Sequence, residues 1–182
     1  MTASTVRGRA RWPLFLGLAA VVVVADQLTK AWLVSVLPVP GDRLSLVGDY
    51  ARLVHSQNSG ALFGLFKDQA LLFGLVSIGV VGLIVWYHGS SGRNTLLSLA
   101  LGLLLGGALG NLIDRLRLGY VVDFVDIGIG GLRFYTFNVA DMAISGAVLL
   151  LILSAFLPIH REPAGRPVPA AEPTEPAEAV DA

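Results

Sequence analysis

Residues 96–116 read LLSLALGLLLGGALGNLIDRL, an apolar run whose polar side chains gather mainly at its end. At 1.5 Å per residue, a helix needs roughly 20 mostly apolar residues to cross the hydrocarbon core of a bilayer, and this run is long enough. Gly102, Gly106 and Gly110 recur at four-residue intervals, which places them on one helical face and lets a neighbouring helix approach closely. The segment therefore predicts a membrane-spanning helix in tight contact with a second one.

Three further apolar runs accompany this segment, at residues 14–37, 70–87 and 139–157. Only 14% of the 182 residues are charged, whereas an average soluble domain carries about 25% charge. Lipid is therefore the expected solvent of the chain. We predict an all-α membrane protein with four transmembrane helices and both termini on one side.

The first run has a competing interpretation as a cleavable secretory signal, because Arg7, Arg9 and Arg11 precede its apolar stretch. However, apolar residues resume after Lys30 and make the run long enough to span. Since three more runs follow, we favour a retained membrane anchor.

The four spans divide the chain into a basic arm at 1–11, a four-helix transmembrane domain at 12–160 and a tail at 161–182. The tail is rich in Pro, Ala and Glu and cannot bury enough apolar area to order itself, so we predict disorder there. Two larger loops, at about 38–69 and 118–137, lie on the face opposite the termini.

Basic residues near the spans indicate the orientation of the chain. They divide evenly, with Arg7, Arg9, Arg11, Arg93, Arg161 and Arg166 on the terminal side, and Arg43, Arg52, Lys67, Arg115, Arg117 and Arg133 on the other. The terminal side concentrates its charge in shorter segments, and the arm before the first span contains no acid. We therefore expect both termini in the cytoplasm and the larger loops on the outward face of the membrane.

Both larger loops contain stretches in which polar and apolar residues alternate, a pattern typical of short strands. The alternation covers residues 43–47 and 132–137. Gly130 and Gly131 separate residues 125–129 from 132–137, which predicts a hairpin turn. We expect a small outward-facing β-sheet at the membrane surface.

The inventory of reactive side chains excludes most kinds of hydrolytic site. The chain has no cysteine, and His55, His88 and His160 lack the His-Glu-x-x-His spacing of a zinc protease. A Ser-His-Asp triad could use only His55 on the outward side, and Ser56 beside it belongs to no nucleophile elbow. Lys30 paired with a serine stays formally open without a supporting motif. A net charge of zero, without a Lys/Arg-rich block, argues against a nucleic-acid partner.

Ionisable residues inside spans are costly, so each needs a partner, a wet cavity or a function. Asp26 and Lys30 are one helical turn apart, and an internal ion pair is the simpler interpretation of these two. Asn111, Asp114 and Arg115 share a helical face. They form either an interfacial hydrogen-bond network or a scaffold for a neighbouring carboxylate.

Asp123 and Asp141 are the carboxylates best placed for catalysis. Asp141 opens the fourth span three residues after Asn138, so the dipole at the start of that helix favours its ionised form, whereas burial or a nearby second carboxylate opposes it. Two carboxylates that share a site split their protonation states, and one acts as a base while the other acts as an acid. We interpret Asp123 and Asp141 as such a water-activating pair.

Five segments occur in the order of the signature motifs of lipoprotein signal peptidases, the signal peptidase II family, which the chain resembles over roughly residues 14–157. They are Asp26-Gln27-Leu28-Thr29-Lys30, Asn58-Ser59-Gly60-Ala61-Leu62-Phe63, Gly110-Asn111-Leu112-Ile113-Asp114-Arg115, Val121-Val122-Asp123-Phe124 and Phe137-Asn138-Val139-Ala140-Asp141. Any one motif alone is weak, but five in order are a strong signal. Met142 stands where the family more often has a small polar residue, a departure that concerns local packing only.

The resemblance implies an aspartic endopeptidase of the inner membrane with Asp123 and Asp141 as its catalytic dyad. Its implied substrates are diacylglyceryl-modified prolipoproteins, cut just before the lipidated cysteine. It implies four spans, an outward surface sheet and a gating segment in the first large loop. No metal or organic cofactor is implied, and we expect a monomer surrounded by membrane lipid. The residues implied to line or brace the cleft are Asp26, Lys30, Asn58, Gly60, Asn111, Arg115 and Asn138.

A proton- or ion-coupled transporter subunit is the alternative, because intramembrane Asp residues can relay ions. Transport sites usually lie near the bilayer midplane between internal repeats. The two halves of the chain show no convincing repeat, and Asp123 and Asp141 map near a membrane interface. The motif set therefore favours the peptidase.

Overall fold

The computed structural model describes residues 11–60, 70–91 and 94–156. Three predicted features fall outside these ranges: nearly all of the basic arm, the tail at 161–182, and the end of the second motif at 61–63. The gating segment expected in the first large loop also falls partly outside them.

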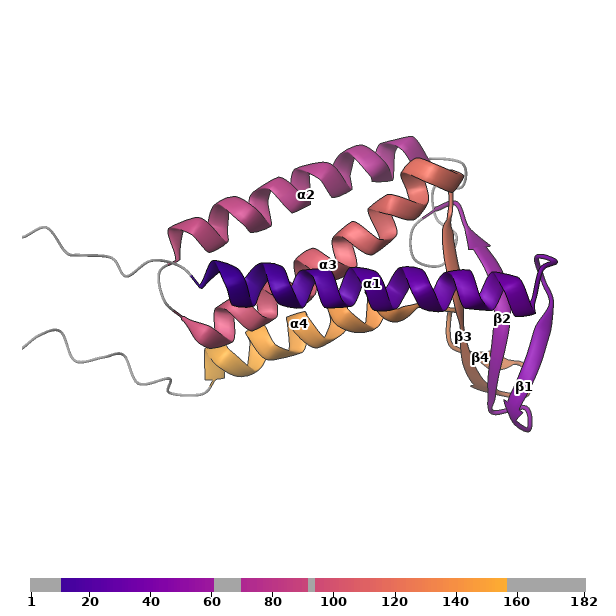
Figure 1. Cartoon of the computed structure of the whole chain (residues 1–182). Helices are drawn as coiled ribbons and strands as arrows, with labels where there is room; N and C mark the ends of the chain where they lie inside the picture. The colour runs from indigo at the N-terminus through magenta and orange to yellow at the C-terminus, as the bar shows by residue number, and fades with distance from the viewer. Residues whose placement is uncertain (1–10, 61–69, 92–93, 157–182) are drawn as a thin grey trace, which may run out of the picture.

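Four helices run side by side and form the body of the molecule (Figure 1). Their bounds are Trp12–Val36 for α1, Ala70–Ser90 for α2, Thr95–Leu118 for α3 and Val139–Phe156 for α4. Each contains a segment long and apolar enough to cross a membrane, so the four predicted spans are confirmed. The end of α2 differs, because the helix continues to Ser90, beyond the predicted run at 70–87. The start of α1 and the end of α4 lie at the same end of the bundle.

The glycine stripe of α3 lets α1 approach closely, as predicted. A Cβ added at Gly102 would lie 2.9 Å from the backbone oxygen of Phe15, and one at Gly106 would lie 2.6 Å from Val22 Cβ. Gly107 serves α4 in the same way, since its Cβ would lie 2.5 Å from the backbone oxygen of Ala140. These contacts place α3 against both helices and bring their polar residues together.

An antiparallel sheet crosses one end of the bundle, in the order β1-β2-β3-β4. Its strands are Arg43–Val47, Ala51–Asn58, Val121–Ile129 and Leu132–Arg133. Strand β1 and the turn at Gly130, where φ is 55°, were predicted. Strand β2 was not identified from the sequence, and β4 is shorter than the predicted strand at 132–137. Phe137 instead forms an isolated bridge to Val125.

An apolar cluster fastens the sheet to the bundle. Leu33 and Leu37 at the end of α1 pack with Leu53 of β2 and with Val122 and Phe124 of β3. The cluster fixes β3 across the ends of the helices.

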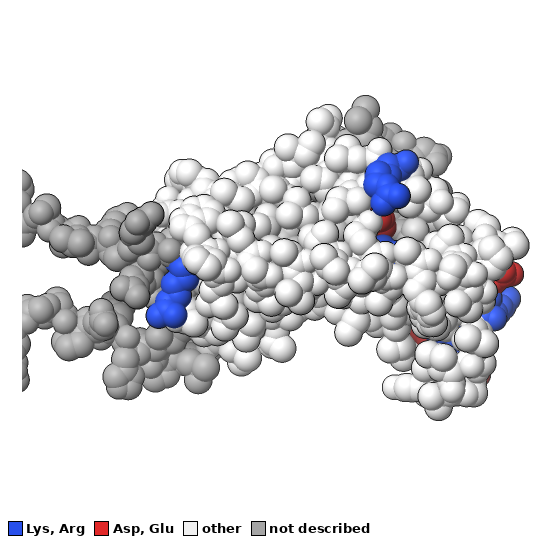
Figure 2. Space-filling model, in the orientation of Figure 1, with Lys and Arg blue, Asp and Glu red and all other residues white. Residues whose placement is uncertain are grey.

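Figure 2 shows that charged side chains on the visible face lie towards the two ends, with an uncharged band between them. Such a band suits a lipid environment.

Candidate active site

Asp123 and Asp141 meet at the sheet end of the bundle, where β3 passes the start of α4. Asn138 joins them, because its side-chain N–H group donates to Asp123 Oδ1 at 2.6 Å and its backbone N–H donates to Asp141 Oδ2 at 3.2 Å. Asn138 is fully buried, with 0% of its surface exposed. One enclosed residue therefore fixes the two carboxylates relative to each other.

Asp141 takes part in a reciprocal cap at the start of α4. Its backbone N–H donates to Asn138 Oδ1 at 3.0 Å, while its carboxylate accepts the backbone N–H of Asn138. This is the capping-box arrangement, which satisfies N–H groups that helix geometry leaves free. The predicted position of Asp141 in the first helical turn is confirmed. The helix dipole favours negative charge there.

Asp123 is almost fully enclosed, with 2% of its surface exposed. Asn58, at the end of β2, donates to Asp123 Oδ2 at 3.0 Å and so holds the second oxygen. Burial raises the pKa of Asp123 to about 7, and the charge of Asp141 adds to this effect, whereas the hydrogen bonds from Asn58 and Asn138 oppose it. Asp123 can therefore take up or release a proton near neutral pH.

Asn111 of α3 holds the other carboxylate. Its Nδ2 donates to Asp141 Oδ1 at 2.8 Å, and its Oδ1 accepts an N–H from Lys30 at 3.1 Å. Arg115 follows one turn later, donates to the backbone oxygen of Asn111 at 3.3 Å and lies 5.8 Å from the centre of the Phe73 ring. The predicted shared face of Asn111 and Arg115 is thus directed at one site.

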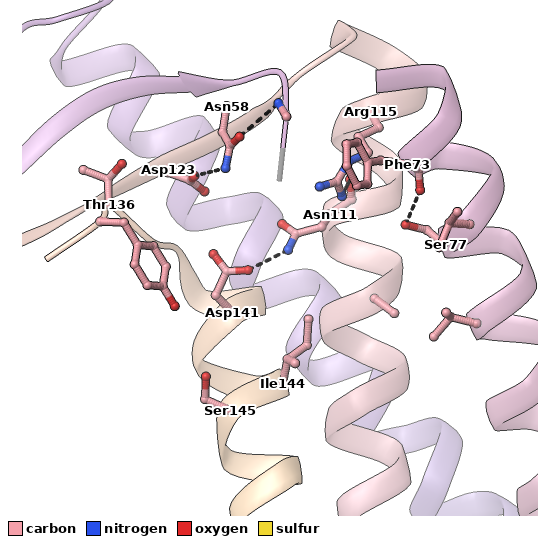
Figure 3. A pocket seen from close by; sticks show the side chains of 15 residues that line it. Asn58, Phe73, Ser77, Asn111, Arg115, Asp123, Thr136, Asp141, Ile144 and Ser145 are labelled. Carbon is pink, nitrogen blue, oxygen red and sulfur yellow. Dashed lines mark hydrogen bonds between the residues drawn. The ribbon is translucent and has the colours of Figure 1, made fainter. Parts of the chain in front are cut away.

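Both carboxylates face a pocket of about 440 Å³ beneath the sheet (Figure 3). Asn58, Gly60, Asn111 and Arg115 line it together with the two aspartates. The N–H of Gly60 donates to Asn58 Oδ1 at 3.1 Å, which orients the Asn58 amide towards Asp123. The rest of the wall was not predicted from the sequence and comprises Phe73, Val76, Ser77, Val80, Ala108, Tyr135, Thr136, Ile144 and Ser145.

A buried ion cluster lies behind the pocket and ties α1 to α3. Lys30 Nζ lies 2.8 Å from Asp26 Oδ2 and 2.8 Å from Asp114 Oδ2, and the predicted pairing of Asp26 with Lys30 is confirmed. Asp26 Oδ1 also accepts the backbone N–H of Ala140 at 2.9 Å, and Asp114 Oδ2 accepts that of Val122 at 3.1 Å. The cluster therefore anchors the residues next to Asp141 and next to Asp123.

A second ion cluster lies on the sheet, away from the pocket. Asp126 on β3 receives Arg52 Nε and Arg133 Nε, each at 2.9 Å, and both arginines also pair with Asp49. Burial opposes ionisation of Asp126, but these hydrogen bonds and charges hold the pKa of Asp126 below its ordinary value. This cluster joins three strands and their turns.

The structure brings all the predicted site residues into one connected region. Asp26 and Lys30 form its base, Asn58, Gly60, Asn111 and Arg115 its walls, and Asn138 the link between Asp123 and Asp141. Gln27 was not among the predicted site residues, and it donates to Asp114 Oδ1 at 2.9 Å. Its position between Asp26 and Lys30 in the first quoted motif was the signal that could have identified it.

The chain resembles known proteins in sequence and in fold. The family described as signal peptidase (SPase) II matches residues 18–157. A lipoprotein signal peptidase of Caulobacter vibrioides is 44% identical over 150 residues, which cover 77% of this chain and 84% of the relative. One of Beijerinckia indica is 38% identical over 162 residues, which cover 86% and 94% of the two chains.

Two solved structures described as bacterial membrane enzymes share the fold. Both are 29% identical to this chain, with TM-scores of 0.74 and 0.73, and they align over 93% and 100% of their own lengths. The alignments cover 84% and 86% of this chain. With its four apolar helices, the chain is a multi-pass membrane protein. On the family match and these relatives, it belongs to the signal peptidase II family.

Proposed function

We propose that this chain is an aspartic endopeptidase that removes signal peptides from diacylglyceryl-modified prolipoproteins, cutting just before the lipidated cysteine. The observation that carries the proposal is the junction at Asn138, which joins Asp123 and Asp141 at the wall of one pocket. Membership of the signal peptidase II family supports the substrate class. The comparisons give no support to the alternative of an ion-coupled transporter subunit.

In the proposed reaction, one aspartate acts as the general base and the other as the general acid. The ionised carboxylate takes a proton from water, and the water attacks the scissile carbonyl. The protonated partner gives its proton first to the carbonyl oxygen and then to the leaving amine. The raised pKa of Asp123 and the helix-start position of Asp141 favour Asp123 as the proton holder and Asp141 as the base.

The pocket wall supports a substrate that stays partly in lipid. Val76 and Val80 of α2 and Ile144 of α4 line the pocket within membrane-spanning helices. The two valines are also exposed on the bundle surface, at 54% and 40%. A diacylglyceryl group can remain against this apolar side while the peptide reaches Asp123 and Asp141. Because every proposed site residue belongs to one chain, a monomer is sufficient.

A cleavage assay tests the substrate class. The full chain in liposomes is given a precursor peptide with diacylglyceryl on its cysteine, and the same peptide without lipid, and the products are identified by mass spectrometry. We expect a cut immediately before the lipidated cysteine and little cleavage of the unlipidated control. Equal cleavage of both peptides, or none of either, contradicts the proposal.

We further propose that both termini lie in the cytoplasm and that the sheet and pocket lie on the outer face of the inner membrane. The absence of cysteine allows single labelling sites to be introduced. Gly131 lies at the exposed hairpin of the sheet, and Ser90 lies at the opposite end of the bundle. We expect a membrane-impermeant maleimide to label G131C in intact spheroplasts, and S90C only after permeabilisation. The reverse pattern contradicts this orientation.

A further inference from the structure

Lys30 is a buried cation that the proposed reaction does not use directly. Its side chain is 4% exposed, and its ammonium contacts Asp26 and Asp114, each at 2.8 Å, and Asn111 Oδ1 at 3.1 Å. An ammonium group has three N–H donors and no acceptor, so these three oxygens match its donors one for one. Two carboxylates hold Lys30 in place, and its third N–H points at the amide that holds Asp141.

This third hydrogen bond determines how the Asn111 amide is oriented. Because Asn111 Oδ1 accepts the hydrogen bond from Lys30, Asn111 Nδ2 faces Asp141 and donates to Asp141 Oδ1 at 2.8 Å. A flipped amide would set donor against donor at Lys30 and acceptor against acceptor at Asp141, which is unfavourable at both ends of a buried contact. Lys30 therefore opposes the flip.

Asn138 is the other donor to Asn111 Oδ1, but it is shared. Its Nδ2 reaches Asn111 Oδ1 at 3.1 Å, the backbone oxygen of Val122 at 3.3 Å and Asp123 Oδ1 at 2.6 Å. An amide nitrogen has two hydrogens for these three acceptors, and Asp123 is the nearest. Lys30 is thus the principal donor that keeps the Asn111 oxygen turned away from Asp141.

We propose that Lys30 is a positioning residue for the cleavage reaction: it binds the Asn111 oxygen so that the Asn111 N–H always points at Asp141. This inference rests on the proposed function of Asp123 and Asp141. Asn111 then holds Asp141 as a hydrogen-bond acceptor, with the same orientation in every turnover. Without Lys30 the amide can flip and the carboxylate shifts. A small misplacement of a reacting group costs about 10- to 100-fold in rate.

A double-mutant cycle between Lys30 and Asn111 tests the proposal, with kcat and KM for a diacylglyceryl precursor peptide as the readout. Lys30→Met should lower kcat about 10- to 100-fold with little change in KM, because the defect lies in the reacting carboxylate. In the Asn111→Ala background the same change should lower kcat less than about threefold. Equal fold-changes in the two backgrounds would overturn the proposal.

A second variant controls for misfolding, because Lys30→Met alone leaves two buried carboxylates, Asp26 and Asp114, without their cation. Lys30→Met with Asp114→Asn preserves the cluster charge: one lysine and two aspartates carry −1, as do Met, Asn and one aspartate. It should show the same dependence on Asn111 as the single variant. A wild-type kcat in this charge-matched protein would also overturn the proposal.

Arg52→Met is the matched control, because it likewise removes a cation from a buried carboxylate, Asp126, in the second ion cluster away from the pocket. We expect a lower Tm with kcat near the wild-type value. A kcat loss as large as that of Lys30→Met would contradict the specific role of Lys30.

Absence of cleavage by the wild-type chain refutes both this role and the proposed function. Wild-type cleavage with an additive cycle refutes only the role of Lys30.

Discussion

Asp123 and Asp126 lie three residues apart on β3, both buried, and their surroundings are opposite. Asp123 accepts N–H groups from the neutral amides of Asn58 and Asn138, whereas Asp126 accepts from the guanidinium groups of two arginines. Burial therefore raises the pKa of Asp123 to about 7, while the arginines overcome burial and lower the pKa of Asp126. One strand carries a carboxylate that exchanges protons and another that stays ionised.

The difference between Asp123 and Asp126 shows how carboxylates that stabilise the fold differ from those proposed for acid–base chemistry. Asp26 and Asp114 also pair with a cation, since each lies 2.8 Å from Lys30. Carboxylates paired with cations in this way join neighbouring elements of the fold. A carboxylate held by neutral amides stays oriented but keeps a protonation equilibrium near working pH, which acid–base chemistry requires.

The largest expected effect is on cleavage. Asp123→Asn and Asp141→Asn should each lower kcat/KM for the lipidated peptide by about 10⁴-fold, because an amide can neither accept nor give the transferred proton. Asp126→Asn, on the same strand as Asp123, should stay within about threefold of wild type at temperatures where it is folded. Wild-type cleavage by the Asp123 or Asp141 variant would contradict the proposed catalytic roles of these two aspartates.

The next effect is the pH dependence of stability, in which the two aspartates act in opposite directions. The folded pKa of Asp123 lies above its ordinary value of 3.8, so its contribution is fully present below about pH 4 and is lost as pH rises through about 7. Asp123→Asn should therefore gain stability relative to wild type between pH 4 and 8, on the order of a few kcal/mol. Thermal unfolding in detergent across this range measures it.

Asp126 gives the reverse sign in the same experiment. Its folded pKa is lowered, so its contribution is present above the ordinary pKa and is lost as pH falls through the folded value. The stability deficit of Asp126→Asn should therefore shrink on acidification below about pH 4. A deficit independent of pH would show that the arginine pairing is not its source.

At neutral pH, Asp126→Asn should lower the free energy of unfolding by about 1.5–3 kcal/mol, because two charge-assisted hydrogen bonds are lost on a buried carboxylate. Asp49→Asn is the matched comparison, since Asp49 pairs with the same arginines but its side chain is 56% exposed. Screening by water limits its expected loss to less than about 1 kcal/mol. Equal losses in chemical denaturation would contradict the importance of burial.

The smallest expected effect concerns Asn58, which donates one of the hydrogen bonds to Asp123. Asn58→Ala should lower kcat about tenfold. Because the lost hydrogen bond favours the ionised form, the pKa of Asp123 should rise, and the alkaline limb of the pH–rate profile should move to higher pH. A shift to lower pH would contradict the assigned contact.

The sequence predicted the parts of the molecule that local periodicity and composition control. The long apolar runs identified the helices, and the spacing of Gly102, Gly106 and Gly110 correctly identified the face on which α1 packs. Asp141 could be placed at a helix start from Asn138 and the apolar run that follows. The fold class therefore follows from the sequence, and the motifs name residues that the structure places around one pocket.

Contacts between distant segments could not be predicted in this way. Strand β2 places Ser56 opposite Asp123 and so brings Asn58 to the carboxylate, but that register depends on pairing across about 65 residues of chain. Likewise, Lys30 meets Asp114 only because the glycine stripe brings α1 and α3 together. The aromatic wall residues Phe73 and Tyr135 have no polar signal that distinguishes them from lipid-facing side chains.

The proton on Asp123 can be observed directly. Infrared spectroscopy of the purified chain resolves the C=O stretch of a protonated carboxyl group, which ionised aspartates lack. We predict a band at about pH 6 that disappears as pH rises through about 7, is absent in Asp123→Asn and persists in Asp126→Asn. A wild-type spectrum without this band, or an unchanged band in Asp123→Asn, would contradict the account.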